Sequence, residues 1–114
     1  MAMLTRPKLQ LILNGRKNLA GCDLSGLDLN GVDFSGANLR NTNLSGTNLA
    51  GCNFAGADLY GANLNYAFMH GADLRDTNLD ATTMLNTRLR NVNFGEPAFL
   101  FEDMTFDEDV FAVA

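Results

Sequence analysis

Residues 36–64 read GANLRNTNLSGTNLAGCNFAGADLYGANL, and in this stretch a large apolar residue returns at every fifth position. The same spacing extends in both directions, from Leu19 to Phe94, without a gap or an insertion. An uninterrupted pattern of this length indicates one structural unit that is repeated along the chain. The 16 large apolar residues are Leu19, Leu24, Leu29, Phe34, Leu39, Leu44, Leu49, Phe54, Leu59, Leu64, Met69, Leu74, Leu79, Met84, Leu89 and Phe94.

The other positions of the unit are nearly as regular. The residue before the large apolar position is Asn or Asp in 13 of 16 repeats, and the exceptions are Phe68, Thr83 and Arg88. The residue two positions before it is mostly Ala, Thr or Cys, and Gly stands two positions after it in 9 of 16 repeats. The unit therefore reads A/T/C–N/D–L/F–x–G.

A period of five matches neither an α-helix, which repeats every 3.6 residues, nor a strand, which alternates every 2.0. The apolar column stays inside only if the chain turns once in each repeat, and Gly and Asx residues favour such turns. A single unit cannot bury its own apolar face, so successive coils must stack. Phe34, Phe54 and Phe94 lie 20 and 40 residues apart, which predicts four repeats per coil and a square cross-section.

These repeats resemble the A(D/N)LXX motif of the pentapeptide repeat proteins, and the resemblance covers about residues 17–95. It implies an all-β solenoid, a right-handed quadrilateral β-helix, here of about four coils built from 16 pentapeptide repeats. The Leu/Phe and the Ala-type residues then point inward, and the Asx residues support the turns. Small members with such regular repeats are abundant in cyanobacteria, so a bacterial source, and among bacteria a cyanobacterial one, is implied by the resemblance alone.

We interpret residues 1–114 as one domain, because the chain has 114 residues and each end should cover an open coil. Residues 1–16 form the expected N-terminal cap, with a short helix over 6–14 that Thr5 would cap. A strand is the alternative for this segment, because the pattern LQLIL fits both elements.

Residues 96–114 form an acidic C-terminal segment in which Pro97 interrupts the repeat. The spacing Thr105-Phe106-Asp107-Glu108 is that of a capping box and predicts a short helix over 105–112. Two interpretations of the segment are open: it covers the last coil, or it pairs two molecules end to end, as in the family's dimers. Monomer and homodimer are both open for the same reason. The phenylalanines concerned are Phe99, Phe101, Phe106 and Phe111.

No residues in the chain have the spacing of a catalytic or metal site. His70 is the single histidine, and Cys22 and Cys52 lie in the small inward column as apolar fillers. The glycines recur every five residues as part of the architecture and do not form a phosphate-binding loop. We therefore expect no catalytic residues, no metal and no cofactor, and the chain is not predicted to be an enzyme.

Composition is typical of a protein of the cytoplasm. The chain is 46% apolar and 18% charged, which allows a buried core. Its apolar runs are far shorter than the roughly 20 residues that span a bilayer. Two cysteines without disulfide-rich spacing fit a reducing compartment. The prediction is a cytoplasmic location with no membrane partner.

One repeat, AFMHG, departs from the pattern. In this repeat Phe68 takes the Asx position, Met69 takes the Leu position and His70 follows. The Gly expected just before the repeat is replaced by Tyr66. We expect Tyr66 and Phe68 to lie around one corner near His70, with Arg88 and Arg90 one coil further along the same side. Exposed aromatic rings beside arginines are typical of protein-binding hot spots. The alternatives are a local bulge that packs on itself and ordinary sequence drift without a function.

Charge decides between two functions that the resemblance implies. The family's best-known activity is protection of DNA gyrase by an acidic dimeric rod that imitates DNA. Residues 17–95 hold five basic and seven acidic residues, a net charge of −2, whereas residues 96–114 hold six acidic residues. DNA carries one negative charge per roughly 1.7 Å of its axis. A net charge of −2 over residues 17–95 is far below that charge density, so the rod is a poor imitation of DNA. The net charge of −5 also argues against direct binding of nucleic acid.

The sequence therefore favours a non-catalytic, rigid module for protein interaction or structure, with an unidentified protein partner. A DNA-mimicking protein that binds DNA gyrase or a topoisomerase is the alternative.

Overall fold

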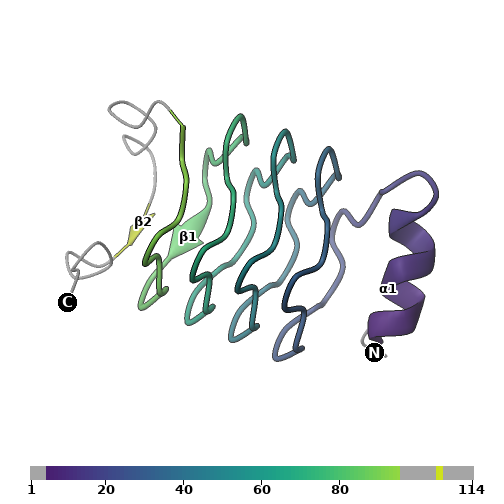
Figure 1. Ribbon diagram of the computed structural model, residues 1–114, viewed down its shortest axis with the longest axis horizontal. Helices are drawn as coiled ribbons and strands as arrows, with labels where there is room; N and C mark the ends of the chain where they lie inside the picture. Colours follow the sequence, from purple (N-terminus) through teal and green to yellow (C-terminus); the bar gives the residue numbers. More distant parts are fainter. Residues whose placement is uncertain (1–4, 96–104, 107–114) are drawn as a thin grey trace.

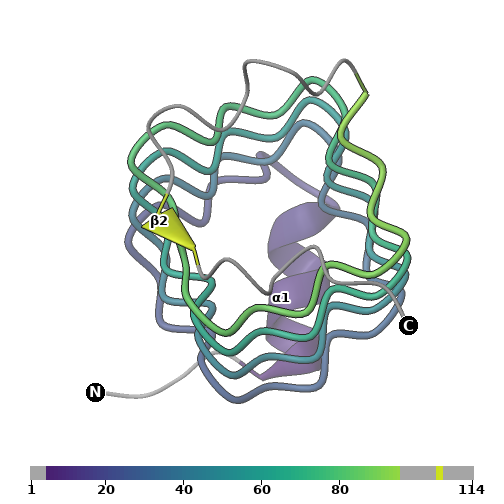
Figure 2. The same cartoon turned by 90° about the vertical axis from the view of Figure 1, so that its left-hand side faces the viewer.

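A computed structural model describes residues 5–95 and 105–106 of the chain. Within them it contains helix α1 (Arg6–Leu13) and two short strands, β1 (Thr83–Met84) and β2 (Thr105–Phe106). Between α1 and residue 95 the backbone winds into a stack of coils (Figure 1). Viewed along the stack, successive coils superimpose in a four-sided outline (Figure 2). The predicted β-helix is therefore observed.

Backbone bonds between neighbouring coils show how many residues one coil contains. Bridges pair Asn18 with Asn38, Asn38 with Asp58, and Asp58 with Asn78, all in parallel orientation. Each step is 20 residues, so one coil contains four repeats, as predicted. The N–H of Leu39 donates to the carbonyl of Asp58 at 2.8 Å, and equivalent bonds recur along the stack.

The interior of the coils holds the two inward columns of the repeat. Phe34 and Phe54 are fully buried and stack face to face, with ring centroids 5.0 Å apart and planes 6° apart. Inward polar groups bond to the backbone: the Thr42 hydroxyl donates to the carbonyl of Leu39 at 2.8 Å. The Cys52 thiol donates to a main-chain carbonyl, and burial raises its pKa to about 11. The interior of the described coils is therefore largely apolar, and each of its buried side-chain N and O atoms has a hydrogen-bond partner.

The corners of the coils require a left-handed backbone. Gly meets this need in most repeats, and several of the other corners hold Asn or Asp, which tolerate positive φ well. Ala81 has φ of 57° and is exposed, so its methyl group strains the backbone without contributing to the core.

Ala81→Gly is expected to raise the free energy of unfolding by about 0.5–1 kcal/mol, because it relieves that strain. The same substitution at buried Ala62 is expected to lower it by about 1 kcal/mol, since Ala62 packs inside at an ordinary φ. Urea unfolding of both variants measures the two changes. If both substitutions changed the free energy of unfolding in the same direction, the strain assigned to the corner at Ala81 would be contradicted.

Helix α1 closes the N-terminal end of the stack (Figure 1). Its Leu9 and Leu13 are buried, and the Thr5 side chain accepts a bond from the N–H of Lys8. The Arg6 guanidinium donates to the carbonyls of Asp28 and of Asn30, at 2.8 and 2.9 Å. The predicted helix over 6–14 and its Thr5 cap are confirmed within one residue, and the strand alternative is wrong.

The prediction of a helix that begins at Thr105 is wrong. Thr105–Phe106 is strand β2, which pairs in parallel with β1 and aligns Thr105 with Thr83 and Phe106 with Met84. The capping-box signal is local, whereas the last coil offers an unpaired strand edge whose backbone bonds compete with helix formation. The paired residues Thr83 and Thr105 are 22 positions apart in the sequence, whereas partners in the regular coils are 20 apart. The rest of the predicted helix lies outside the described residues.

Candidate interaction surface

The Asx residue of each repeat closes a local turn. Its side-chain Oδ1 accepts a bond from the backbone N–H two residues further on, with N···O distances of 2.9–3.2 Å. Such Asx turns satisfy an N–H at the surface of the coil that the ladder leaves unpaired. The 13 acceptors are Asn18, Asp23, Asp28, Asp33, Asn38, Asn43, Asn48, Asn53, Asp58, Asn63, Asp73, Asn78 and Asn93.

The three repeats without Asx differ in how they replace this turn. Thr83 lies in β1, and the N–H of Leu85 is satisfied from the neighbouring coil by Asn65 Oδ1 at 2.9 Å. In the other two repeats, the N–H groups of His70 and Arg90 have no acceptor within the described part of the chain. Only these two N–H groups are therefore left open at a position where the other repeats supply an oxygen.

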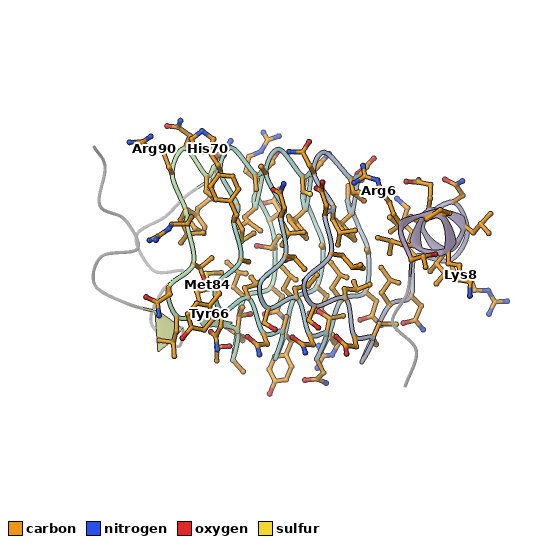
Figure 3. The ribbon with its side chains drawn as sticks, turned by 90° about the horizontal axis from the view of Figure 1, so that it is seen from below. Arg6, Lys8, Tyr66, His70, Met84 and Arg90 are labelled. Carbon is orange, nitrogen blue, oxygen red and sulfur yellow. The ribbon has the colours of Figure 1, made fainter. Side chains whose placement is uncertain are left out.

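The two open positions lie on the same side of the rod, in adjacent coils. Phe68 and Arg88 are bridge partners, and the N–H of Met69 donates to the carbonyl of Arg88 at 2.9 Å. His70 and Arg90 follow them and lie in neighbouring coils at the same edge (Figure 3). We call Phe68, His70, Arg88 and Arg90 the Phe68 surface.

Phe68 and His70 form a ring stack at the surface. Their centroids are 5.9 Å apart and their planes 12° apart. Phe68 is 45% exposed, whereas His70 is partly buried. Of the two alternatives, a bulge packed on itself does not fit, because the parallel ladder continues through Phe68 and the large apolar residue Met69 stays fully buried. Sequence drift stays as the other alternative.

Tyr66 does not join this pair. It occupies a corner with φ of 64° and is 66% exposed. Figure 3 shows it at the opposite edge of the rod from His70 and Arg90. The expected closeness of Tyr66 to His70 is therefore wrong, because the residues from 66 to 70 run along a whole side of the coil and separate the two rings.

The arginines of this surface differ from the other arginines of the rod. Arg40 bonds to Asp58 at 2.9 Å, and Arg75 bonds to Asp73 at 2.8 Å. Arg88 and Arg90 are exposed, and neither forms an ion pair with a described residue. Residues 66–72 and 86–92 contain no Asp or Glu. Within the described coils, the Phe68 surface therefore presents two basic side chains without an ion-paired carboxylate.

The sequence profile described as pentapeptide repeats matches residues 18–56, 37–76 and 57–95. The chain belongs to the pentapeptide repeat family. A pentapeptide repeat protein from the Arabidopsis thaliana thylakoid lumen is 33% identical, with a TM-score of 0.68, and the match covers 81% of this chain. This chain spans 60% of the length of that protein. The family and this likeness support the right-handed quadrilateral β-helix that the sequence predicts.

Two other solved pentapeptide repeat structures are more distant. One from Nostoc Pcc 7120 is 26% identical with a TM-score of 0.49, and the match covers 94% of this chain and 99% of that one. QnrB1, a plasmid-mediated fluoroquinolone resistance protein, is 14% identical with a TM-score of 0.23, over 77% of this chain and 61% of its own. No match is found among functionally curated proteins.

Other features of this pentapeptide repeat protein bear on its chemistry. Within residues 5–95 and 105–106, no three His, Cys, Asp or Glu side chains gather as a metal site would require. None of the described helices has the length and apolar character needed to cross a membrane. Among the phenylalanines of the C-terminal segment, Phe106 lies in β2, and Phe99, Phe101 and Phe111 lie outside the described residues. Capping and dimerisation by this segment remain the two predictions for it.

Proposed function

We propose that this pentapeptide repeat protein is a non-catalytic module that binds a protein partner through the Phe68 surface. The observation that carries the proposal is Phe68 itself. It replaces the Asx of the repeat, keeps 45% of its surface in water, and stacks on His70 beside two exposed arginines. Aromatic residues and Arg are the types enriched at the centres of protein interfaces.

The backbone beneath the surface is rigid, which favours binding. The N–H of Phe68 donates to the carbonyl of Thr47 at 2.8 Å, and the N–H of Gly71 donates to the carbonyl of Arg90 at 3.0 Å. Coils on both sides therefore hold the backbone of this surface. A surface that is already ordered loses little conformational entropy when a partner binds.

Imitation of DNA remains the alternative, with less support. The rod's acidic residues lie mainly at turn positions, and two of them, Asp58 and Asp73, are paired with arginines. Pairing reduces the negative field that a DNA-binding enzyme would meet. The described coils therefore lack the concentrated negative charge by which a DNA mimic would bind gyrase or a topoisomerase.

The test is capture of partners from a lysate of the source organism, with quantitative mass spectrometry. Phe68→Asn restores the residue type of the other repeats, so it should keep the fold while it removes the ring. Loss of a hot-spot ring should lower capture of the partner by at least about tenfold. Tyr60→Ser, which removes an exposed ring elsewhere on the rod, is the matched control and should leave capture unchanged.

A partner that both variants retain equally would contradict the assigned surface. Capture of gyrase or topoisomerase subunits that is insensitive to Phe68→Asn would favour the DNA-mimic alternative. The absence of any specific partner would argue against a role in protein binding.

A further inference from the structure

The Phe68 surface lacks the two side-chain oxygens that Asx residues supply at the corresponding positions of other repeats. One coil before His70, the N–H of Ala50 donates to Asn48 Oδ1 at 3.1 Å. Phe68 follows Asn48 in the same ladder and has no side-chain oxygen, so the N–H of His70 has no acceptor of this kind. The same holds one coil further on, where Arg88 replaces Asx and leaves the N–H of Arg90 open. Two N–H donors are thus open in adjacent coils.

An oxygen at such a position is favourable when it belongs to a carboxylate. At Asp33, bonds from the side chain and then the backbone N–H of Ser35 lower the pKa of the carboxyl group. The backbone N–H at this position therefore contributes to the stabilisation of negative charge, together with the Ser35 hydroxyl. Arg88 and Arg90 belong to the same surface as the open donors, neither forms an ion pair with a described residue, and residues 66–72 and 86–92 contain no carboxylate.

We propose that the Phe68 surface receives a carboxylate side chain, Asp or Glu, from an extended segment of its protein partner. The carboxylate accepts from the open N–H of Arg90 and pairs with the guanidinium groups of Arg88 and Arg90. An apolar side chain next to it in the segment packs on the exposed ring of Phe68. This proposal rests on the proposed function and adds the chemistry of the partner: an acidic residue beside an apolar one.

The charge of the protein favours an acidic protein segment over a nucleic acid. Nucleic-acid binding requires many phosphate contacts, since the backbone carries a charge every roughly 1.7 Å. The rod offers only Arg88 and Arg90 as exposed arginines without a carboxylate partner in the described coils, on a chain of net charge −5. Two arginines match one or two carboxylates, whereas a nucleic acid would need many more cationic contacts than this surface offers.

The chain offers substitution pairs that separate the parts of this site. Arg88→Gln removes the guanidinium, and Arg88→Asn removes it and also restores an Asx oxygen that occupies the N–H of Arg90. Phe68→Ala removes the ring, whereas Phe68→Asn removes it and also occupies the N–H of His70. A Gln side chain is one carbon too long for the Asx turn, which makes it the matched control for Asn.

The probe is a displayed library of random dodecapeptides, selected on the wild-type protein and counter-selected on Arg88→Gln/Arg90→Gln. Enriched peptides are labelled and measured by fluorescence anisotropy. We expect them to contain Asp or Glu beside an apolar residue. Affinity should fall about tenfold or more on Arg88→Gln, as for loss of a charged hydrogen bond, and further on Arg88→Asn. Changing the acidic residue of the peptide to its amide should have a similar effect.

Enriched peptides without acidic residues, or no enrichment over the double variant, would overturn the proposal. Equal peptide affinities for the wild type and both Arg88 variants would also overturn the proposal. Equal losses of affinity on Arg88→Gln and Arg88→Asn would overturn the assigned position of the carboxylate at the N–H of Arg90. Loss of binding on Phe68→Ala alone would leave the proposed function standing without its acidic partner. Retention by every variant, including Phe68→Ala, would contradict the surface itself.

Two further measurements identify other occupants. If labelled oligothymidylate binds the wild type, fails to bind Arg88→Gln/Arg90→Gln, and displaces the peptide, the ligand is a nucleic acid and the proposal is wrong. If the unliganded wild type is a dimer by light scattering and Arg88→Gln makes it a monomer, the occupant is a second copy of the chain. That result also overturns the proposal of a separate partner.

Discussion

Phe54→Ala is expected to lower the free energy of unfolding by about 3–5 kcal/mol, which is the range for removal of a fully buried aromatic ring. Phe54 is 0% exposed and its ring stacks on that of Phe34 at 5.0 Å. The cavity cannot close easily, because the backbone around it is tied into the ladder. The N–H of Phe54 itself donates to the carbonyl of Asp73 in the next coil at 2.8 Å. Most of the volume of the ring should therefore remain empty in the variant.

Denaturant unfolding at equilibrium measures this change, provided that the slope of the transition stays constant. Phe68→Ala is the matched control, since the same ring is removed from a surface that is 45% exposed, and the expected change is below about 1 kcal/mol. The double variant Phe34→Ala/Phe54→Ala should deviate from additivity, because the two rings are in contact. A loss at Phe54 no larger than at Phe68 would show that the ring stack does not support the coil.

Leu9→Asp is expected to detach helix α1 and to convert the protein into an aggregating species. Leu9 is 1% exposed and packs on the first coil, so an aspartate there would bury a charge without a partner. Burial of an uncompensated charge costs several kcal/mol, which exceeds what a helix of eight residues can retain. Release of the helix would expose the strand edge of the first coil to other molecules.

Leu11→Asp provides the control on the same helix, because Leu11 is 72% exposed and points away from the coils. Both variants are compared by light scattering after gentle heating. Aggregation of Leu9→Asp together with a soluble Leu11→Asp is the expected result. A soluble, fully folded Leu9→Asp would show that the open coil edge does not need α1 as a cover.

The regular part of the molecule could be predicted from the sequence because one steric requirement recurs in every repeat. A period of five keeps Leu39, Phe54 or Met69 inside only if the chain turns once per unit, and the 20-residue spacing of phenylalanines indicates the coil size. Helix α1 was also predictable, since Thr5 and the spacing of Leu9 and Leu13 are local signals. Each of these features depends on residues that are near in the sequence.

The strand β2 and the site of partner binding were harder to predict. The local signal at Thr105 favours a helix, but backbone bonding to β1, far away in the sequence, determines the strand. The sequence already contained Phe68, Thr83 and Arg88 as exceptions to the Asx column, so the signal was present. It did not show that one missing turn is replaced by a bond from the N–H of Leu85 to Asn65 Oδ1, whereas the N–H groups of His70 and Arg90 stay open.

The sequence by itself therefore determined the coil, its four-repeat period and the inward columns, because these follow from local geometry that each repeat imposes on the next. The same period placed Arg88 and Arg90 one coil beyond Phe68 and His70, and the bridge between Phe68 and Arg88 confirms this. Only the tertiary structure decided that Phe68 stacks on His70 and that Tyr66 lies apart from them. Both features depend on the length of each side of the coil.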